Sequence, residues 1–125
     1  MSSDDGTASG PITAAAGARP AGFQRREIGV GGEEQVKHLT SMLDVQAAQP
    51  SVIRLRDWVF DRLAPRPGET AVDVGSGTGE TVIRLAGAVG ELGRAIGIEP
   101  NPALRAVAAD RASAARVQAE FLDGA

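Results

Sequence analysis

The plainest structural signal in the chain is Thr70-Ala71-Val72-Asp73-Val74-Gly75-Ser76-Gly77-Thr78-Gly79-Glu80. Its first half is small, β-branched and apolar around one acid, and its second half has glycine at every second position. An apolar run that stops at such glycines indicates a buried parallel strand, a tight turn and then a helix start. Glycine adopts positive φ and has no Cβ, so the backbone of this turn can approach a ligand closely. The free N–H groups of the following helix also favour a small-molecule site here.

The spacing of the glycines separates two kinds of nucleotide ligand. A dinucleotide fingerprint is Gly-x-Gly-x-x-Gly, and its third glycine would fall on Glu80. Here the glycines alternate through 75–79, and Asp73 stands two residues before the first. This order resembles the first motif of class I S-adenosylmethionine-dependent methyltransferases. The resemblance implies that the turn, including Ser76 and Thr78, passes under the methionine part of the cofactor, and that Asp73 orients its amino end.

Composition narrows the classes of function. The chain has 125 residues, about one domain's worth, with a net charge of −3, and therefore has no basic field to recruit nucleic acid. No apolar run approaches the ~20 residues that span a bilayer, and no signal peptide is recognisable. Cysteine is absent and histidine occurs once, so a zinc site is not expected. These features fit a cytoplasmic protein with no metal, nucleic-acid or membrane partner.

Two helices are predicted ahead of the glycine turn. Residues 1–22 are polar, small and without apolar periodicity, and we expect a disordered tail there. The methyltransferase resemblance implies that residues 23–64 form a helical lid over the cofactor and the acceptor. Apolar periodicity predicts helices over 33–46 and 50–63 in this stretch. His38 in the first is a candidate general base because its ordinary pKa is near neutrality, or else simply an exposed helix residue. In the second, Trp58 is expected to pack in the core beside an apolar stripe at Val52, Leu55, Val59 and Leu63.

A second strand with an acid at its end follows the turn. A helix over 81–89 should stop at Gly90, and an apolar strand should then run from Arg94 to Glu99. Glu99 follows Gly79 by about twenty positions, the place of the acid that binds ribose hydroxyls in nucleotide-binding folds. The methyltransferase resemblance implies the same role for Glu99. It also implies that the next residue, Pro100, packs against adenine.

A third helix and strand complete the pattern. Asn101-Pro102 should cap a helix whose buried stripe is Leu104, Val107, Ala108, Ala112 and Ala115. Alternating apolar residues over 117–122 then predict a strand. In the methyltransferases this strand usually ends in an acid after a glycine, and that acid contacts the adenine amino group. Here Ala125 follows Gly124, so Asp123 fills this place only if the loop is shifted.

These elements predict an α/β fold, a Rossmann-like three-layer sandwich with parallel strands. Right-handed crossovers give the strand order third, second, first, which leaves the 70–74 strand at an open apolar edge. Methyltransferases of this class continue to seven strands. Residues 65–125 are therefore expected to be the first half of a cofactor domain, completed by more chain, a second chain or a homo-oligomer.

The function that the methyltransferase resemblance implies is methyl transfer from S-adenosylmethionine to a small-molecule acceptor, with S-adenosylhomocysteine as product. Such an enzyme mainly supplies proximity and alignment, because the cofactor is already activated. Two alternatives stay open. One is a non-catalytic half that binds the cofactor or pairs with a second chain. The other is a nicotinamide-dependent oxidoreductase, against which Glu80 argues.

Overall fold

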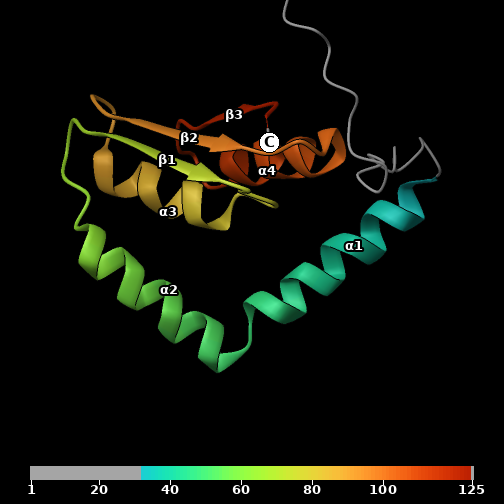
Figure 1. Cartoon of the computed structure of the whole chain (residues 1–125). Coiled ribbons are helices and arrows are strands. Elements are labelled where there is room, and N and C mark those ends of the chain that lie inside the picture. The colour runs from blue at the N-terminus through green and yellow to red at the C-terminus, as the bar shows by residue number, and fades with distance from the viewer. Residues whose placement is uncertain (1–31, 125) are drawn as a thin grey trace, which may run out of the picture. The chain divides into compact units, whose positions relative to one another are not determined.

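A computed structural model describes residues 32–124 (Figure 1). The predicted tail at 1–22 and the start of the predicted lid at 23–31 lie outside these residues. Along the chain the elements are α1 (Gly32–Ala47), α2 (Pro50–Leu63), β1 (Thr70–Val74), α3 (Glu80–Val89), β2 (Arg94–Ile98), α4 (Pro102–Ala114) and β3 (Glu120–Leu122). Within the described residues, none of the helices has the length and apolar character needed to span a bilayer.

The three strands form one parallel sheet in the order β1-β2-β3, with β1 at the edge. Both the parallel arrangement and this order confirm the prediction. The third strand, however, is shorter than predicted and begins only at Glu120. The cause is the exit from α4: Arg116 has a φ of 57°, and the Val117 N–H donates to the Ala112 carbonyl at 3.2 Å. The segment before Glu120 is therefore folded back on the helix and pairs with no strand.

Helices α3 and α4 cover the same face of this sheet (Figure 1). Two right-handed crossovers in one direction produce this arrangement. The core is built by the apolar side of α3 on Ala95 of β2, with Ala71 of β1 and Phe121 of β3 packed against it. The α3 residues of this core are Val82, Leu85, Ala86 and Val89. On the other face the side chains alternate outward, and Val72, Val74 and Leu122 are exposed.

The helix ends follow the signals in the sequence. Asn101 accepts hydrogen bonds from the N–H groups of Ala103 and Leu104, which caps α4 as predicted. Gly90 closes α3, also as predicted. The buried stripe of α4 consists of Leu104, Ala108 and Ala112. Ala115, which was expected to belong to that stripe, is exposed because the helix ends at Ala114.

The two N-terminal helices bury none of their residues. The prediction that Trp58 packs in the core is wrong: its indole is exposed, and the Arg62 guanidinium lies 5.6 Å from the ring centroid. Helix α2 instead turns its half-buried positions Val52, Arg56 and Phe60 inward, and Phe60 packs against the core. These positions are four residues apart and therefore share one face.

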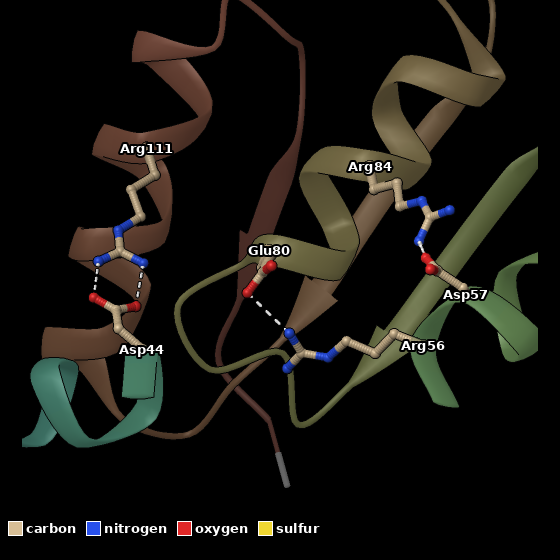
Figure 2. Close-up of polar contacts among 6 residues, drawn as sticks. All are labelled: Asp44, Arg56, Asp57, Glu80, Arg84 and Arg111. Atoms are coloured by element: carbon tan, nitrogen blue, oxygen red, sulfur yellow. Dashed lines mark hydrogen bonds and ion pairs between the residues drawn. The ribbon is translucent and has the colours of Figure 1, made fainter. Parts of the chain in front are cut away.

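Ion pairs connect these helices to the sheet helices, as Figure 2 shows. Asp44 of α1 accepts two hydrogen bonds from Arg111 of α4, both at 2.9 Å. On α2, Arg56 donates to Glu80 at 2.8 Å, and Asp57 accepts from Arg84 at 2.7 Å. The Arg84 guanidinium also lies 4.0 Å from the centroid of the Phe60 ring. Charged contacts therefore link α1 to α4 and α2 to α3.

Candidate functional site

The glycine turn joins β1 to α3 and folds over the end of β2. Gly75, Gly77 and Gly79 have φ angles of 79°, 56° and 82°, a region that side chains disfavour. The N–H groups of Gly75 and Ser76 both donate to the carbonyl of Ile98, at 2.7 and 3.1 Å. These bonds place the turn at the carboxyl edge of the sheet, where open α/β sheets bind their ligands.

The three glycines serve two different purposes. A Cβ on Gly79 would lie 2.8 Å from the Ala108 Cβ and 2.9 Å from the Phe121 ring, so close packing excludes a side chain there. A Cβ on Gly75 or Gly77 would meet nothing within 4 Å. The first two glycines therefore leave open space on the side where a Cβ would project, and the third lets α3 pack close to α4 and β3.

Another glycine, Gly97, lies beneath the turn. Gly97 of β2 pairs with Asp73, and a Cβ on it would lie 2.6 Å from the Ser76 hydroxyl and 2.8 Å from Phe121. The Ser76 side chain thus faces β2, and its buried hydroxyl has no hydrogen-bond partner among residues 32–124. Thr78 is also buried. The turn therefore packs directly against β2, and this contact sets the distance between the turn and the sheet.

Asp73 lies half-buried near the end of β1, in a cavity of about 270 Å³ between α2, β1 and α3. Burial raises the pKa of the Asp73 carboxyl, and the positive charge of Arg56 partly opposes this rise. Three apolar side chains of α2, at Leu55, Val59 and Leu63, line the cavity with the charged residues Arg56, Glu80 and Arg84. A cavity with apolar walls and a few charged groups suits a small organic ligand.

Glu99 lies one residue past β2 and is only 8% exposed. Its N–H donates to the Leu122 carbonyl at 3.0 Å, and its own carbonyl accepts from the Arg105 guanidinium at 2.6 Å. The carboxylate takes part in none of the hydrogen bonds or ion pairs found among the described residues. Among the described residues, the fully buried side-chain oxygens without a partner are those of Thr40 and Ser76, so the Glu99 carboxylate keeps access to the space at the strand end. A carboxylate that is open at the end of a parallel strand can accept hydrogen bonds from a ligand there.

The remaining predicted residues fall in two places. Asp123 follows β3, is exposed, and accepts from Arg105 at 3.3 Å; Pro100 is exposed beside Glu99. Asp73, the turn, Glu99 and Asp123 all follow or end parallel strands, so they meet at one edge of the sheet. His38 is exposed on α1 and is not among the residues that line the cavity. Among the described residues, no group of three or more possible metal ligands occurs.

Sequence reasoning missed three charged residues at this edge: Arg56, Glu80 and Arg105. Arg56 had a signal, because positions 52, 56 and 60 share a helix face with the apolar Val52 and Phe60. Glu80 was considered only as a replacement for a glycine. No sequence pattern pointed to Arg105. Its partners are the Glu99 carbonyl and the Asp123 carboxylate, which only the folded chain brings near it.

A family comparison agrees with this geometry. The model of the family described as protein-L-isoaspartate(D-aspartate) O-methyltransferase matches residues 33–125. The chain belongs to this family. The predicted resemblance to methyltransferases is thereby confirmed. The family description names an acceptor in protein, so the expected small-molecule acceptor is not confirmed.

Solved structures of methyltransferases show the same fold. An S-adenosylmethionine-dependent methyltransferase from Aquifex aeolicus is 23% identical with a TM-score of 0.55, over 74% of this chain and 46% of that one. A protein-L-isoaspartate O-methyltransferase is 20% identical with a TM-score of 0.52, over 56% and 22%. A TehB-like methyltransferase from Corynebacterium glutamicum is 19% identical with a TM-score of 0.52, over 75% and 47%. No curated protein matches the chain.

These comparisons confirm two expectations and limit a third. The fold is the Rossmann-like fold of the methyltransferases, and the relatives from Aquifex aeolicus and Corynebacterium glutamicum are described as dependent on S-adenosylmethionine, the cofactor that the methyltransferase resemblance implies. The chain spans less than half the length of each of these three solved structures. What the whole protein methylates is therefore taken up as a proposal.

Proposed function

We propose that this chain binds S-adenosylmethionine at the carboxyl edge of its sheet and takes part in transferring the methyl group to an acceptor. The observation that carries the proposal is Glu99, a largely buried residue whose carboxylate makes none of the side-chain hydrogen bonds or ion pairs among the described residues, beside a turn whose first two glycines leave open space. A nucleoside offers the two hydroxyl donors that such a carboxylate accepts.

Each end of the cofactor has residues of suitable chemistry. Asp73 lies on the cavity side of the turn and is placed to accept from the methionine ammonium group. Glu99 would hold the ribose, while Pro100 and Asp123 flank the adenine. The roles of the predicted turn residues Gly75, Ser76, Gly77, Thr78 and Gly79 are to supply backbone and space, because the Ser76 side chain faces β2.

The chemical demands on the protein are modest. When bound, the cofactor supplies a methyl group that is already activated by a sulfonium sulfur. The residues of this chain need only orient it and exclude water from its methionine end. Residues 23–64 act as the lid in this proposal, since α2 lines the cavity beside Asp73. An acceptor that is weakly acidic would need a general base, and His38, the candidate from the sequence, is exposed on α1 and does not line the cavity beside Asp73.

The acceptor we propose is a small organic molecule that enters the cavity beside Asp73. Its apolar walls at Leu55, Val59 and Leu63 would hold an uncharged carbon skeleton. The family description favours a second candidate, an isoaspartyl or D-aspartyl carboxylate in a protein. The exposed face of the sheet at Val72 and Val74 fits the expectation that more chain, a second chain or another copy completes the domain.

Titration calorimetry with S-adenosylhomocysteine and with NAD tests the cofactor. We expect the first to bind and NAD not to bind, and we expect Glu99→Gln to weaken binding by about tenfold, since it removes a charged acceptor. Glu91→Gln, in an exposed turn, is the matched control and should bind like the wild type. Binding of NAD alone, or equal affinities for all three proteins, would contradict the proposal.

Transfer of labelled methyl groups separates the acceptors and the non-catalytic alternative. Label that moves to small carboxylic, phenolic or amine compounds supports the small-molecule acceptor. Label that moves only to an isoaspartyl peptide, and not to its aspartyl twin, supports the protein acceptor. Cofactor binding with no transfer to either, even with a completing chain added, supports a binding half without catalysis.

A further inference from the structure

One arginine of α4 connects the ends of two neighbouring strands. The Nη1 of Arg105 donates to the backbone carbonyl of Glu99 at 2.6 Å and lies 3.3 Å from the Asp123 carboxylate. Its side chain is largely covered, at 22% exposure, whereas the Asp123 side chain is open to solvent. A guanidinium with little solvent around it holds such contacts more strongly than an exposed one.

The residues around Arg105 are fixed from several sides. The Glu99 N–H is bound to the Leu122 carbonyl of β3, and Asn101 caps the first turn of α4. The backbone N–H of Arg105 itself donates to the Asn101 carbonyl at 3.0 Å. The segment from Glu99 to Arg105 is therefore a closed loop, and the arginine side chain returns to its first residue.

Without Arg105, the Glu99 carbonyl would lose the only partner it has among the described residues. The Glu99 backbone would then lose its tie to α4, and the neighbouring carboxylate would be held less firmly, while Pro100 still restricts rotation of the peptide that follows Glu99. The Asp123 carboxylate would lose its counter-charge at the same time. Both acids that the proposed site offers to the nucleoside thus depend on one side chain that contacts neither ribose nor base in this proposal.

We propose that Arg105 is a positioning residue for the nucleoside end of the cofactor, and that it acts by fixing the Glu99 backbone and the Asp123 carboxylate. This inference rests on the proposed function, because it presumes that Glu99 meets the ribose. It predicts an effect confined to the ribose and adenine. The methionine end lies at Asp73 and the cavity, and no contact of Arg105 reaches it.

The test measures the affinity for S-adenosylhomocysteine and for its 2′-deoxy analogue by calorimetry. In the wild type, loss of the hydroxyl should weaken binding by about tenfold, because the Glu99 carboxylate loses a donor. Arg105→Gln should weaken S-adenosylhomocysteine by about tenfold, yet bind the two ligands within about twofold of each other. Arg105→Lys keeps a charged donor and should recover part of both the affinity and the preference.

Arg94→Gln is the matched control. Arg94 makes a two-bonded pair with Glu120, also between β2 and β3, but at the opposite ends of the strands. It should keep both the affinity and the preference for the 2′-hydroxyl. Arg105→Lys serves alone if Arg105→Gln fails to fold: it should lose part of the affinity and part of the preference, and full retention of both would overturn the role of Arg105.

The outcomes separate this inference from the proposed function. A wild type that binds no S-adenosylhomocysteine overturns the proposed function itself. A wild type that binds it and prefers the 2′-hydroxyl, with Arg105→Gln keeping that same preference, overturns only the role of Arg105. Equal losses in Arg105→Gln and Arg94→Gln would also overturn it, since they would reflect the stability of the sheet alone.

Discussion

The N-terminal helices and the sheet with its two helices are held in place by different forces. Helix α3 buries four side chains against the strands, whereas α1 and α2 bury none. The connections that α1 and α2 make to the sheet helices are the three ion pairs of Figure 2 and the partly buried Phe60. One part is therefore stabilised by removal of apolar surface from water, and the other mainly by exposed charges.

This difference implies different stabilities within one chain. Burial of a leucine contributes about 1.5–3 kcal/mol, whereas an exposed ion pair contributes about 0.2–1 kcal/mol and is screened by salt. Elements with few buried contacts open locally before the core does. The part that forms the cavity wall can thus move while the part that carries the glycine turn stays rigid, which suits a proposed lid.

The largest contrast is expected from one substitution made in each part. Leu85→Ala removes a side chain that is 2% exposed in α3 and should cost about 2–5 kcal/mol of unfolding free energy. Leu55→Ala removes one that is 60% exposed in α2 and should cost less than about 0.5 kcal/mol. Urea denaturation of both variants measures the difference. Similar losses would mean that α2 is packed as firmly as α3, contrary to the comparison.

A smaller contrast is expected within the glycine turn. Gly79→Ala places a Cβ against Ala108 and Phe121, and overpacking of this kind adds about 1–3 kcal/mol to the strain of positive φ. Gly75→Ala meets only the strain, since nothing lies within 4 Å. In thermal unfolding, Gly79→Ala should have a lower melting temperature than Gly75→Ala. The reverse order of melting temperatures would show that the turn does not pack closely against α4 and β3.

The smallest effect is expected from pH at the junction of α1 and α4. The hydrogen bonds from Arg111 lower the pKa of Asp44 below its ordinary 3.8. A carboxyl whose pKa is lower in the folded chain stabilises the fold above pH 3.8, and this contribution disappears as the pH falls through the lowered pKa. Asp44→Asn should therefore be slightly less stable than the wild type at neutral pH, by less than about 1 kcal/mol, and equal to it in acid.

Denaturant midpoints at neutral pH and at a series of pH values falling below 3.8 provide this measurement. Asp61→Asn removes a charge from α2 outside the ion pairs of Figure 2 and is the matched control. The denaturant midpoint of Asp61→Asn should equal that of the wild type at every pH. A pH-independent deficit in Asp44→Asn would mean that the Arg111 pair does not form in solution.

The sheet region could be predicted from sequence because its signals are local. The alternating glycines, the caps at Asn101 and Gly90 and the short apolar runs each specify their own few residues, and right-handed crossovers then leave one strand order. Glu99 was found because its distance from the turn is set by one helix and one strand. Its burial and its lack of a partner among the described residues are what the structure adds.

The N-terminal helices were predicted as elements but not in orientation. Helix α2 carries apolar residues on more than one side, so its stripe at Leu55, Val59 and Leu63 gave no reason to prefer the face at Phe60. The deciding contacts come from Glu80 and Arg84, which lie a strand and a turn away. Arg105 is a similar case. An arginine on a helix is ordinarily a solvated residue, and only the folded chain shows which two strand ends it reaches.

The close packing around Gly97 implies that this position tolerates few substitutions, although it has no proposed contact with the ligand. Gly97 lies within β2, where its neighbours Ile96 and Ile98 are ordinary apolar residues. Because Ser76 and Phe121 occupy the space of its missing Cβ, even alanine there would lift the turn above it. A survey of all substitutions would score this position among the ligand-binding residues, although the ligand would never touch it.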